Sequence, residues 1–230
     1  MIERARVLDA LTTVRDPELD QSLVELGFVR AVRIDGVTVS VSLRLPTYFC
    51  APNFAYLMAA DAQAAVSSVD GVQRTRVLLE DHFTSREINE GLAQGKDFDA
   101  TFPEQTIGEG LGGLRNLFRR KAFIARQGRL SHVLQKRGVT DAELSRLRLT
   151  DLPPGAETEA YLARRRELGI NTSENAPFLM TADGRPVPSH QVRQHVRFAR
   201  TVSSSIEGNA EFCRGLLRTR YRNKVEEVGS

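Results

Sequence analysis

A single cysteine, Cys50, stands where a strand pattern gives way to a helix pattern, two residues before Pro52. The amino end of a helix carries partial positive charge and unpaired N–H groups, which favour the thiolate form of a nearby cysteine. A thiolate is both a metal ligand and a sulfur nucleophile. The sequence therefore predicts that Cys50 is presented for metal or sulfur chemistry; the alternative is a small buried apolar residue.

Two carboxylates and one histidine are candidates to lie near that thiol. Asp16 and Glu18 belong to an acidic turn, and His82 stands at the end of a later strand pattern. Carboxylate oxygens and imidazole nitrogens are metal ligands in proteins. We expect Cys50, Asp16, Glu18 and His82 to form one metal-handling edge. The alternatives are solvated carboxylates in a turn that ends a helix, and a structural histidine.

The segments that position these residues alternate between helix and strand periodicity. Apolar residues at helical spacing predict a helix over 2–14, which Asp16-Pro17 ends. Residues 28–34 and 37–45 predict a β-hairpin about an Asp-Gly turn, and the second strand alternates between apolar and polar residues. A helix of about 16 residues from Pro52 and a strand near 72–79 complete the order α-β-β-α-β.

The predicted fold class is α+β, with an N-terminal α-β-β-α-β domain that holds a three-stranded sheet, followed by a mostly α-helical C-terminal region. We predict a domain over 1–94, a Gly-rich linker over 95–113 and a basic, mainly helical domain over 114–230. Within the linker, Phe98 and Phe102 are expected to pack back onto a domain. The C-terminal helices are expected near 114–127, 130–137, 140–148, 157–168, 189–202 and 207–222, with a helix boundary at the serines 203–205.

Charge is divided unevenly along the chain. Residues 1–100 carry 10 Lys and Arg against 15 Asp and Glu, whereas residues 101–230 carry 22 against 14. This asymmetry predicts two units with different surfaces. The basic helices fit solvated faces or an acidic partner protein, and we expect no nucleic-acid partner. We find no run of about 18 apolar residues and no signal-peptide pattern, so we expect a cytoplasmic protein without a membrane partner.

The two cysteines, Cys50 and Cys213, stand far apart in the sequence and form no CxxC pair. A disulfide framework is therefore not expected. Iron–sulfur clusters are usually held by four thiolates, which one chain with two cysteines does not supply. A cluster would need a second subunit or other ligands. No catalytic triad or cofactor motif stands out, so we do not expect an enzyme.

The stretch DPELDQSLVELGFV and its surroundings resemble the SufT/PaaD-type metal–sulfur cluster biosynthesis (iron–sulfur assembly) family over about residues 1–85. The matching positions are Asp16, Pro17, Glu18, Leu26, Gly27, Thr47 and Cys50, followed by Gly71, Val72, Val77 and Leu79. The family's usual Pro-Gly-Cys-Pro turn is replaced by Tyr48-Phe49-Cys50-Ala51-Pro52, and the third strand ends in Asp81-His82-Phe83 instead of proline-tryptophan. These departures fit a specialised member devoted to one client.

The resemblance implies an accessory protein of iron–sulfur assembly or metalloenzyme maturation without catalytic turnover of its own. The implied cargo is iron, or an iron–sulfur cluster shared across a homodimer through two Cys50 thiolates. The implied partner is a client metalloenzyme, such as the di-iron component of a multicomponent oxygenase. The alternative is a chaperone or structural docking component of a di-iron oxygenase system that binds no metal.

Overall fold

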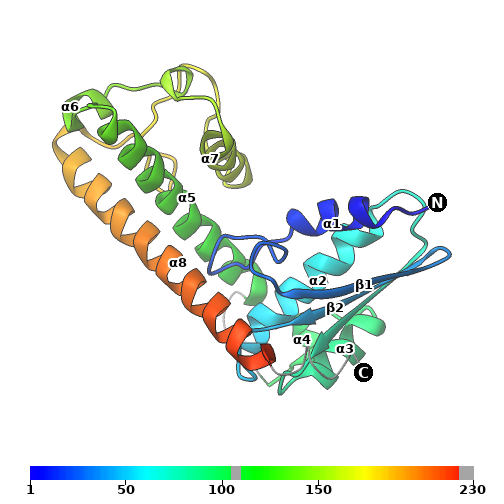
Figure 1. The fold of residues 1–230 in the computed structure, drawn as a ribbon. Coiled ribbons are helices and arrows are strands. Elements are labelled where there is room, and N and C mark those ends of the chain that lie inside the picture. The colour runs from blue at the N-terminus through cyan, green and yellow to red at the C-terminus, as the bar shows by residue number, and fades with distance from the viewer. Residues whose placement is uncertain (105–109, 223–230) are drawn as a thin grey trace. The chain divides into compact units, whose positions relative to one another are not determined.

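The computed structural model describes residues 1–104 and 110–222, and the chain forms two compact units (Figure 1). Unit 1 comprises Met1–Gly113 and Asn209–Ser230, and unit 2 comprises Leu114–Gly208. The chain passes from unit 1 to unit 2 within helix α5 (Gly110–Lys136) and returns within helix α8 (Val192–Tyr221). Unit 2 is therefore an insertion in the sequence of unit 1.

Unit 1 has the predicted α-β-β-α-β order, and the α+β fold class is confirmed. Its elements are α1 (Arg4–Thr12), β1 (Val29–Asp35), β2 (Thr38–Arg44), α2 (Pro52–Ser67), β3 (Arg74–Glu80), α3 (Ser85–Ala93) and α4 (Phe98–Thr101). The three strands form one sheet of order β1-β2-β3, in which β1 and β2 are antiparallel and β2 and β3 are parallel. Gly36 has φ +56°, the left-handed conformation that a tight hairpin turn requires.

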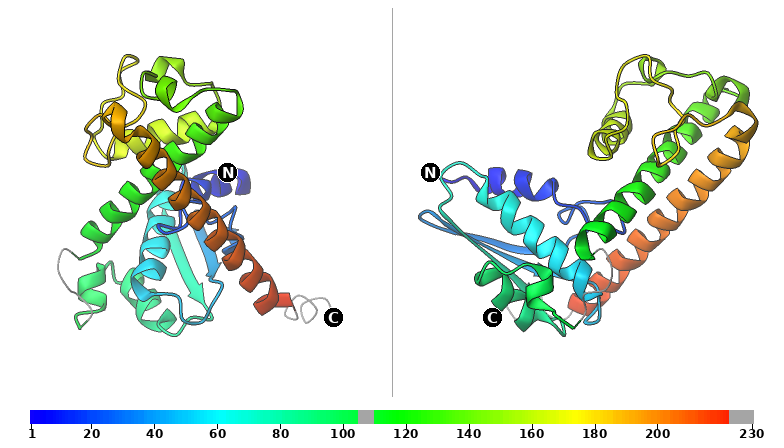
Figure 2. Two further views of the ribbon diagram at one scale, coloured as in Figure 1. Left: turned by 90° about the vertical axis from the view of Figure 1, so that its left-hand side faces the viewer. Right: turned by 180° about the vertical axis from the view of Figure 1, so that it is seen from behind.

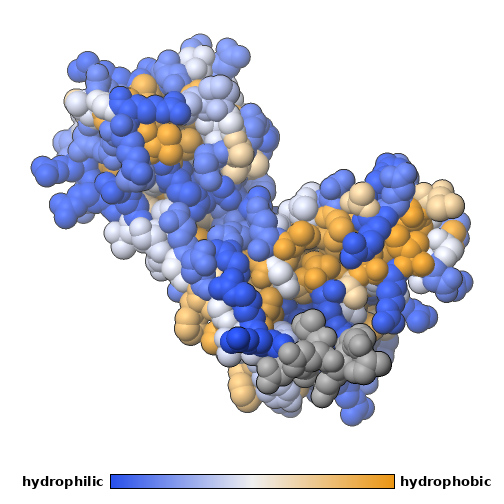
Figure 3. Space-filling model, viewed as in Figure 1, coloured by the Kyte–Doolittle hydropathy of each residue, from blue (hydrophilic) through white to orange (hydrophobic). Residues whose placement is uncertain are grey.

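Helix α2 connects the two parallel strands and packs against β3 (Figures 1 and 2). A parallel pair needs such a crossover, which is usually a helix. The apolar side chains of β2 (Val39, Val41 and Leu43) are buried, whereas its serines are only partly covered, as the alternation predicts. Figure 3 shows that the apolar surface of unit 1 gathers around α1 and β1.

The acidic turn between α1 and β1 is fastened to the core of unit 1 by leucines. Leu19, Leu23 and Leu26 are each at most 3% exposed and belong to that core. The backbone N–H of Leu23 donates to the Val14 carbonyl at 2.9 Å, which closes the turn onto the end of α1. The turn is thus rigidly placed even though it lacks regular secondary structure.

Unit 2 is helical and has its own core. It contains parts of α5 and α8 with α6 (Asp141–Leu144), α7 (Ala156–Glu167) and two short 3₁₀ turns, η1 (Leu149–Asp151) and η2 (Ser189–Gln191). Phe123, Tyr161 and Phe178 are fully buried at its centre, and their rings contact one another. The side-chain amide of Gln127 forms two 2.9 Å hydrogen bonds with the backbone of Met180, which ties α5 to the following loop.

Two predicted helix breaks are wrong. Helix α5 continues through residues 128–129 and α8 continues through the serines 203–205. Gly128 does not end α5, because it lies against α8: a Cβ there would come 2.5 Å from the Ala199 carbonyl carbon. In α8 the hydroxyl of Ser203 bonds to Glu207 one turn later, at 2.9 Å.

The compact units do not coincide with the predicted boundaries 1–94, 95–113 and 114–230, because the end of α8 packs into unit 1. That the predicted domains fold independently of one another stays a prediction. Part of the predicted linker, residues 105–109, lies outside the described residues. Phe98 and Phe102 pack into the core of unit 1, as expected.

Over 1–104 and 110–222, no helix combines the length and apolarity needed to cross a membrane.

Candidate functional site

The loop that carries Cys50 joins the end of β2 to the start of α2. Cys50 lies two residues before α2 begins, and its side chain is half-buried at the edge of the core. Its sulfur is 3.2 Å from the hydroxyl of Thr47. The sulfur is therefore held in place from one side and left partly open to solvent.

His82 fixes the backbone of this loop. The residue is 3% exposed, and its Nε2 lies 2.7 Å from the carbonyl oxygen of Cys50. Its Nδ1 accepts the backbone N–H of Thr84 at 3.2 Å, which leaves Nε2–H as the donor to Cys50. Burial lowers the pKa of His82, so the ring is neutral at pH 7. Both nitrogens are occupied, and a metal would have to displace one of these bonds.

Asp16 organises the acidic turn from within. Its Oδ1 accepts the backbone N–H groups of Glu18 and Leu19, each at 2.8 Å. The residue is only 7% exposed, and burial raises its pKa from the usual 3.8 to about 6 despite these hydrogen bonds. Glu18 is half-buried. Asp16 is therefore not a solvated turn carboxylate.

The final turns of α8 belong to the same site, which the sequence alone did not indicate. The guanidinium of Arg214 donates to the side-chain oxygen of Gln21 in the acidic turn. Leu217 packs beside Gly27, whose added Cβ would lie 3.4 Å from the leucine. Arg220 donates to the carbonyl of Leu45 at 3.0 Å and to that of Asp81. Helix α8 thus spans from the acidic turn to the ends of β2 and β3.

Cys213 lies in this stretch of α8 and packs against the core of unit 1, as Cys50 does. Burial raises the pKa of the Cys213 thiol to about 11, and the negative charges of Asp16, Cys50 and Glu18 add to the effect. Cys50 and Cys213 both pack against the apolar core of unit 1, to which the leucines of the acidic turn also belong.

The sequence did carry a signal for Cys213. Ala210, Cys213 and Leu217 recur at helical spacing, so they form one apolar stripe on α8. The stripe predicts a covered helix face but does not identify what covers it.

Among the residues of 1–104 and 110–222, no three His, Cys, Asp or Glu side chains form a group that could hold a metal ion.

Three exposed aromatic side chains, two in the Cys50 loop and one directly after His82, form what we call the aromatic patch: Tyr48, Phe49 and Phe83. They are 47%, 75% and 41% exposed. Their ring centroids lie 5.0–6.3 Å apart, and the backbone N–H of Phe83 donates to the Tyr48 carbonyl at 3.1 Å. Contiguous exposed apolar surface of this kind is typical of protein interaction sites.

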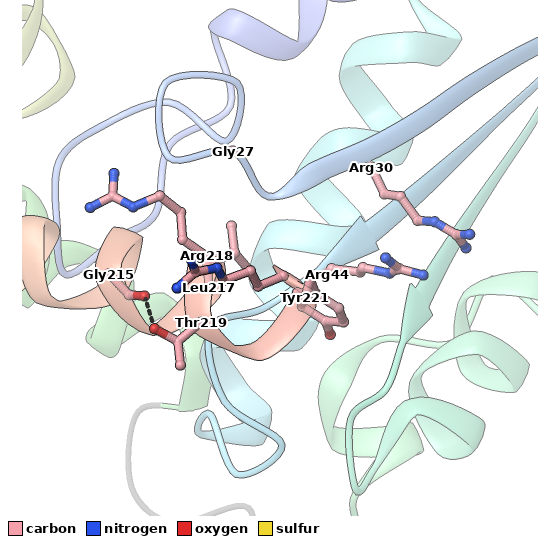
Figure 4. A pocket seen from close by; sticks show the side chains of 9 residues that line it. Gly27, Arg30, Arg44, Gly215, Leu217, Arg218, Thr219 and Tyr221 are labelled. Atoms are coloured by element: carbon pink, nitrogen blue, oxygen red, sulfur yellow. Dashed lines mark hydrogen bonds between the residues drawn. The ribbon is translucent and has the colours of Figure 1, made fainter. Parts of the chain in front are cut away.

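A basic groove of about 800 Å³ lies beside the end of α8 (Figure 4). We call it the arginine groove; it is lined by Gly27, Arg30, Arg44, Gly215, Leu217, Arg218, Thr219, Tyr221 and Arg222. Arg30 and Arg44 share the carboxylate of Glu80, at 2.6 and 3.0 Å. Arg44 also stacks over the ring of Tyr221, 4.5 Å from its centroid. Four arginines thus line the groove, together with the apolar side chain of Leu217.

Comparisons with known proteins match part of this chain. A family model described as iron–sulfur cluster assembly protein matches residues 4–79. An uncharacterized protein of Methanocaldococcus jannaschii, MJ1129, is 36% identical over 95 residues, which are 41% of this chain and 98% of that protein. An iron–sulfur cluster carrier protein of Synechocystis sp. is 42% identical over 77 residues, which are 34% of this chain and 21% of the carrier. No solved structure matches the chain.

Proposed function

This chain belongs to the iron–sulfur cluster assembly protein family, and from that premise we propose that it is an accessory protein that helps to load or stabilise a metal centre in a client metalloenzyme. The cargo is iron, as an ion or as part of a cluster. The similarity to an iron–sulfur cluster carrier over 77 residues supports this cargo. The first client to test is the di-iron component of a multicomponent oxygenase.

One observation carries the proposal: the sulfur of Cys50 is held, yet partly exposed, at the start of α2. A thiolate there contacts the cargo, and the acidic turn with Asp16 and Glu18 belongs to the same compact unit. His82 sets the position of the loop through the Cys50 carbonyl. It joins the cargo's ligands only if its bond to that carbonyl or to Thr84 breaks.

Anaerobic reconstitution with iron and sulfide tests this role, with iron per chain as the measurement. We expect Cys50→Ser to lose most of the bound iron. The matched control is Ala51→Ser, which introduces the same side chain one position later, at the exposed N-cap of α2. Equal iron in the wild type and in Cys50→Ser, with both variants folded by circular dichroism, would overturn the proposal.

The alternative is a docking component that binds no metal, and the aromatic patch favours it. Exposed aromatic side chains and an arginine groove on one compact unit fit a client surface that combines apolar and acidic residues. In that case Phe49→Ser abolishes capture of the purified client, whereas Cys50→Ala leaves client maturation unchanged. The control is Phe212→Ser on α8, since Phe212 is 66% exposed outside the patch.

A further inference from the structure

The part of α8 that belongs to unit 2 carries three arginines in one row. Arg193, Arg197 and Arg200 are exposed, and they stand four and three positions apart, so they share one face of the helix. The other face of this stretch is buried in the core of unit 2 through Val192, Val196 and Ala199. Packing therefore fixes the direction of the arginine row, which faces solvent.

The charges of this row are not compensated. Within residues 1–104 and 110–222, none of the three arginines has a hydrogen bond or an ion pair. The surrounding stretch, residues 184–206, contains no Asp or Glu. Like charges three or four positions apart destabilise a helix by their repulsion. The row thus costs stability within unit 2, and it fits an anionic partner.

A second, uncharged row runs beside the arginines on the solvent side of α8. Its exposed members follow one another at helical spacing: Gln194, Phe198, Thr201 and Ser205. The ring of Phe198 is 59% exposed. The two rows meet at a surface hollow of about 630 Å³, which is lined by Arg197, Arg200, Thr201, Ser204 and Ser205. One line of positive charge therefore lies next to hydroxyl groups, an amide and one aromatic ring.

These side-chain types favour nucleic acid over an acidic protein. Arg, Ser, Thr and Gln are the side chains that donate hydrogen bonds to phosphate oxygens. An aromatic ring beside a cationic track stacks on an unpaired base. A protein interface would need an apolar centre. Among residues 189–206, all of which the structure describes, Phe198 is the only large apolar side chain that is exposed.

We propose that this face of α8 binds single-stranded nucleic acid, with phosphates along the row of Arg193, Arg197 and Arg200 and a base on Phe198. A single line of charge follows one strand, and the distance along the helix from Arg193 to Ser204 is about 17 Å, enough for a few nucleotides. The proposal departs from our sequence-based expectation of no nucleic-acid partner, because charge counts do not show that these arginines share one face without ion pairs.

Fluorescence anisotropy with the full-length protein and a labelled oligothymidylate of about 12 nucleotides tests the proposal, in salt from about 50 to 200 mM. We expect log Kd to rise with log salt with a slope of about 2, because each contacted phosphate of a single strand contributes about 0.7. Arg197→Gln should lower the slope by about 0.7 and weaken binding about three- to tenfold at the lowest salt. Arg197→Lys should keep the slope, because lysine also binds phosphate.

The matched control is Arg166→Gln on α7. Arg166 is also exposed, also lies in a helix of unit 2, and its replacement removes the same charge. This variant should bind the oligothymidylate with the affinity and the slope of the wild type. Phe198→Leu should weaken binding several-fold with the slope unchanged, because it removes stacking and no charge.

Two results would refute the proposal directly: no salt-dependent binding of the oligothymidylate, or equal losses in Arg197→Gln and Arg166→Gln. Tighter binding of a DNA duplex of the same length, or of a polyglutamate peptide, would also refute it, because the face would then serve another anionic partner. Iron per chain after reconstitution separates this inference from the proposed function. Arg197→Gln should load as much iron as the wild type, because its residues lie in unit 2 and Cys50 lies in unit 1.

Discussion

At the scale of single residues, the site contains one carboxylate that is costly to keep charged. Asp16 is almost completely buried, and its two backbone hydrogen bonds offset only part of the cost of removing the charge from water. The difference between the usual pKa of 3.8 and about 6 corresponds to about 3 kcal/mol. Such a cost is common where a charge serves function instead of stability.

Replacing Asp16 by asparagine should stabilise the protein in a pH-dependent manner. The folded-state pKa is raised, so the favourable contribution of the protonated carboxyl is complete below pH 3.8 and lost as the pH rises through about 6. Asparagine keeps an oxygen for the N–H groups of Glu18 and Leu19 but carries no charge. Urea denaturation should show a gain of up to about 3 kcal/mol at pH 7.5 that shrinks toward zero by pH 4.

The matched control is Asp9→Asn, which removes an exposed carboxylate of α1. It should change the free energy of unfolding by less than about 0.5 kcal/mol at either pH. An equal effect of Asp16→Asn at both pH values would contradict the assignment of burial as the cause.

Loss of the His82 ring should loosen the Cys50 loop. His82→Ala leaves the Cys50 carbonyl and the Thr84 N–H without their side-chain partner, at a cost of about 2–3 kcal/mol. In a Cys213→Ser background, alkylation of Cys50 by a maleimide should become several-fold faster. The exposed His190 provides the control: His190→Ala should leave both the rate and the stability unchanged. An unchanged alkylation rate in His82→Ala would show that the ring does not hold the loop.

At the scale of elements, the sequence predicted the hairpin, α2 and β3 to within about two residues. These elements have strong local signals: a strict alternation in β2, an Asp-Gly turn, and Pro52 at the start of α2. The long helices were divided incorrectly, because glycine and serine are ordinarily signals of helix ends. Gly128 is present for a different reason, the close approach of two helices, which depends on residues about 70 positions apart.

Two glycines inside helices should respond in opposite ways to alanine, because Gly128 lies at this close approach and Gly208 does not. Gly128→Ala should destabilise the protein by about 1–3 kcal/mol, because the new methyl group overlaps the backbone of Ala199. Gly208→Ala in α8 should stabilise it by up to about 1 kcal/mol, because that position is exposed and alanine favours a helix. Thermal unfolding measures both. A neutral Gly128→Ala would show that the two helices can separate without cost.

The candidate site was predictable only where its residues lie in one continuous region. Cys50, Asp16 and Glu18 come from the first 50 residues, and a family motif joins them. Cys213 and Arg220 stand more than 100 residues later, and their place depends on the path of α8 back into unit 1. Periodicity indicates that this helix has an apolar face but not which surface receives it.

At the scale of the whole molecule, unit 1 is assembled from two separate stretches of sequence. The M. jannaschii relative matches this chain over 98% of its own length, yet those 95 residues make up only 41% of the chain. More than half of this chain therefore has no counterpart in that relative. The N-terminal part of this chain should accordingly fold by itself, and the end of α8 should add stability by covering apolar surface.

Fragment complementation checks this expectation. Residues 1–104 should unfold cooperatively, at a lower temperature than the full chain, and should expose Cys50 to faster alkylation. A peptide of residues 207–222 in excess should raise the unfolding temperature and slow alkylation. A control peptide with Leu217→Asp should not, because it places a charge against Gly27. An unfolded fragment, or equal effects of the two peptides, would contradict this picture.

Because unit 2 is inserted in the sequence of unit 1, the two stretches of unit 1 are synthesised at different times. Ribosomes add about 5–20 residues per second, so Cys213 is made roughly 10–30 s after Cys50. During that interval the nascent N-terminal part displays Cys50 and the aromatic patch without the end of α8, which later packs onto the same core. A newborn chain and a finished one therefore offer different surfaces to partners.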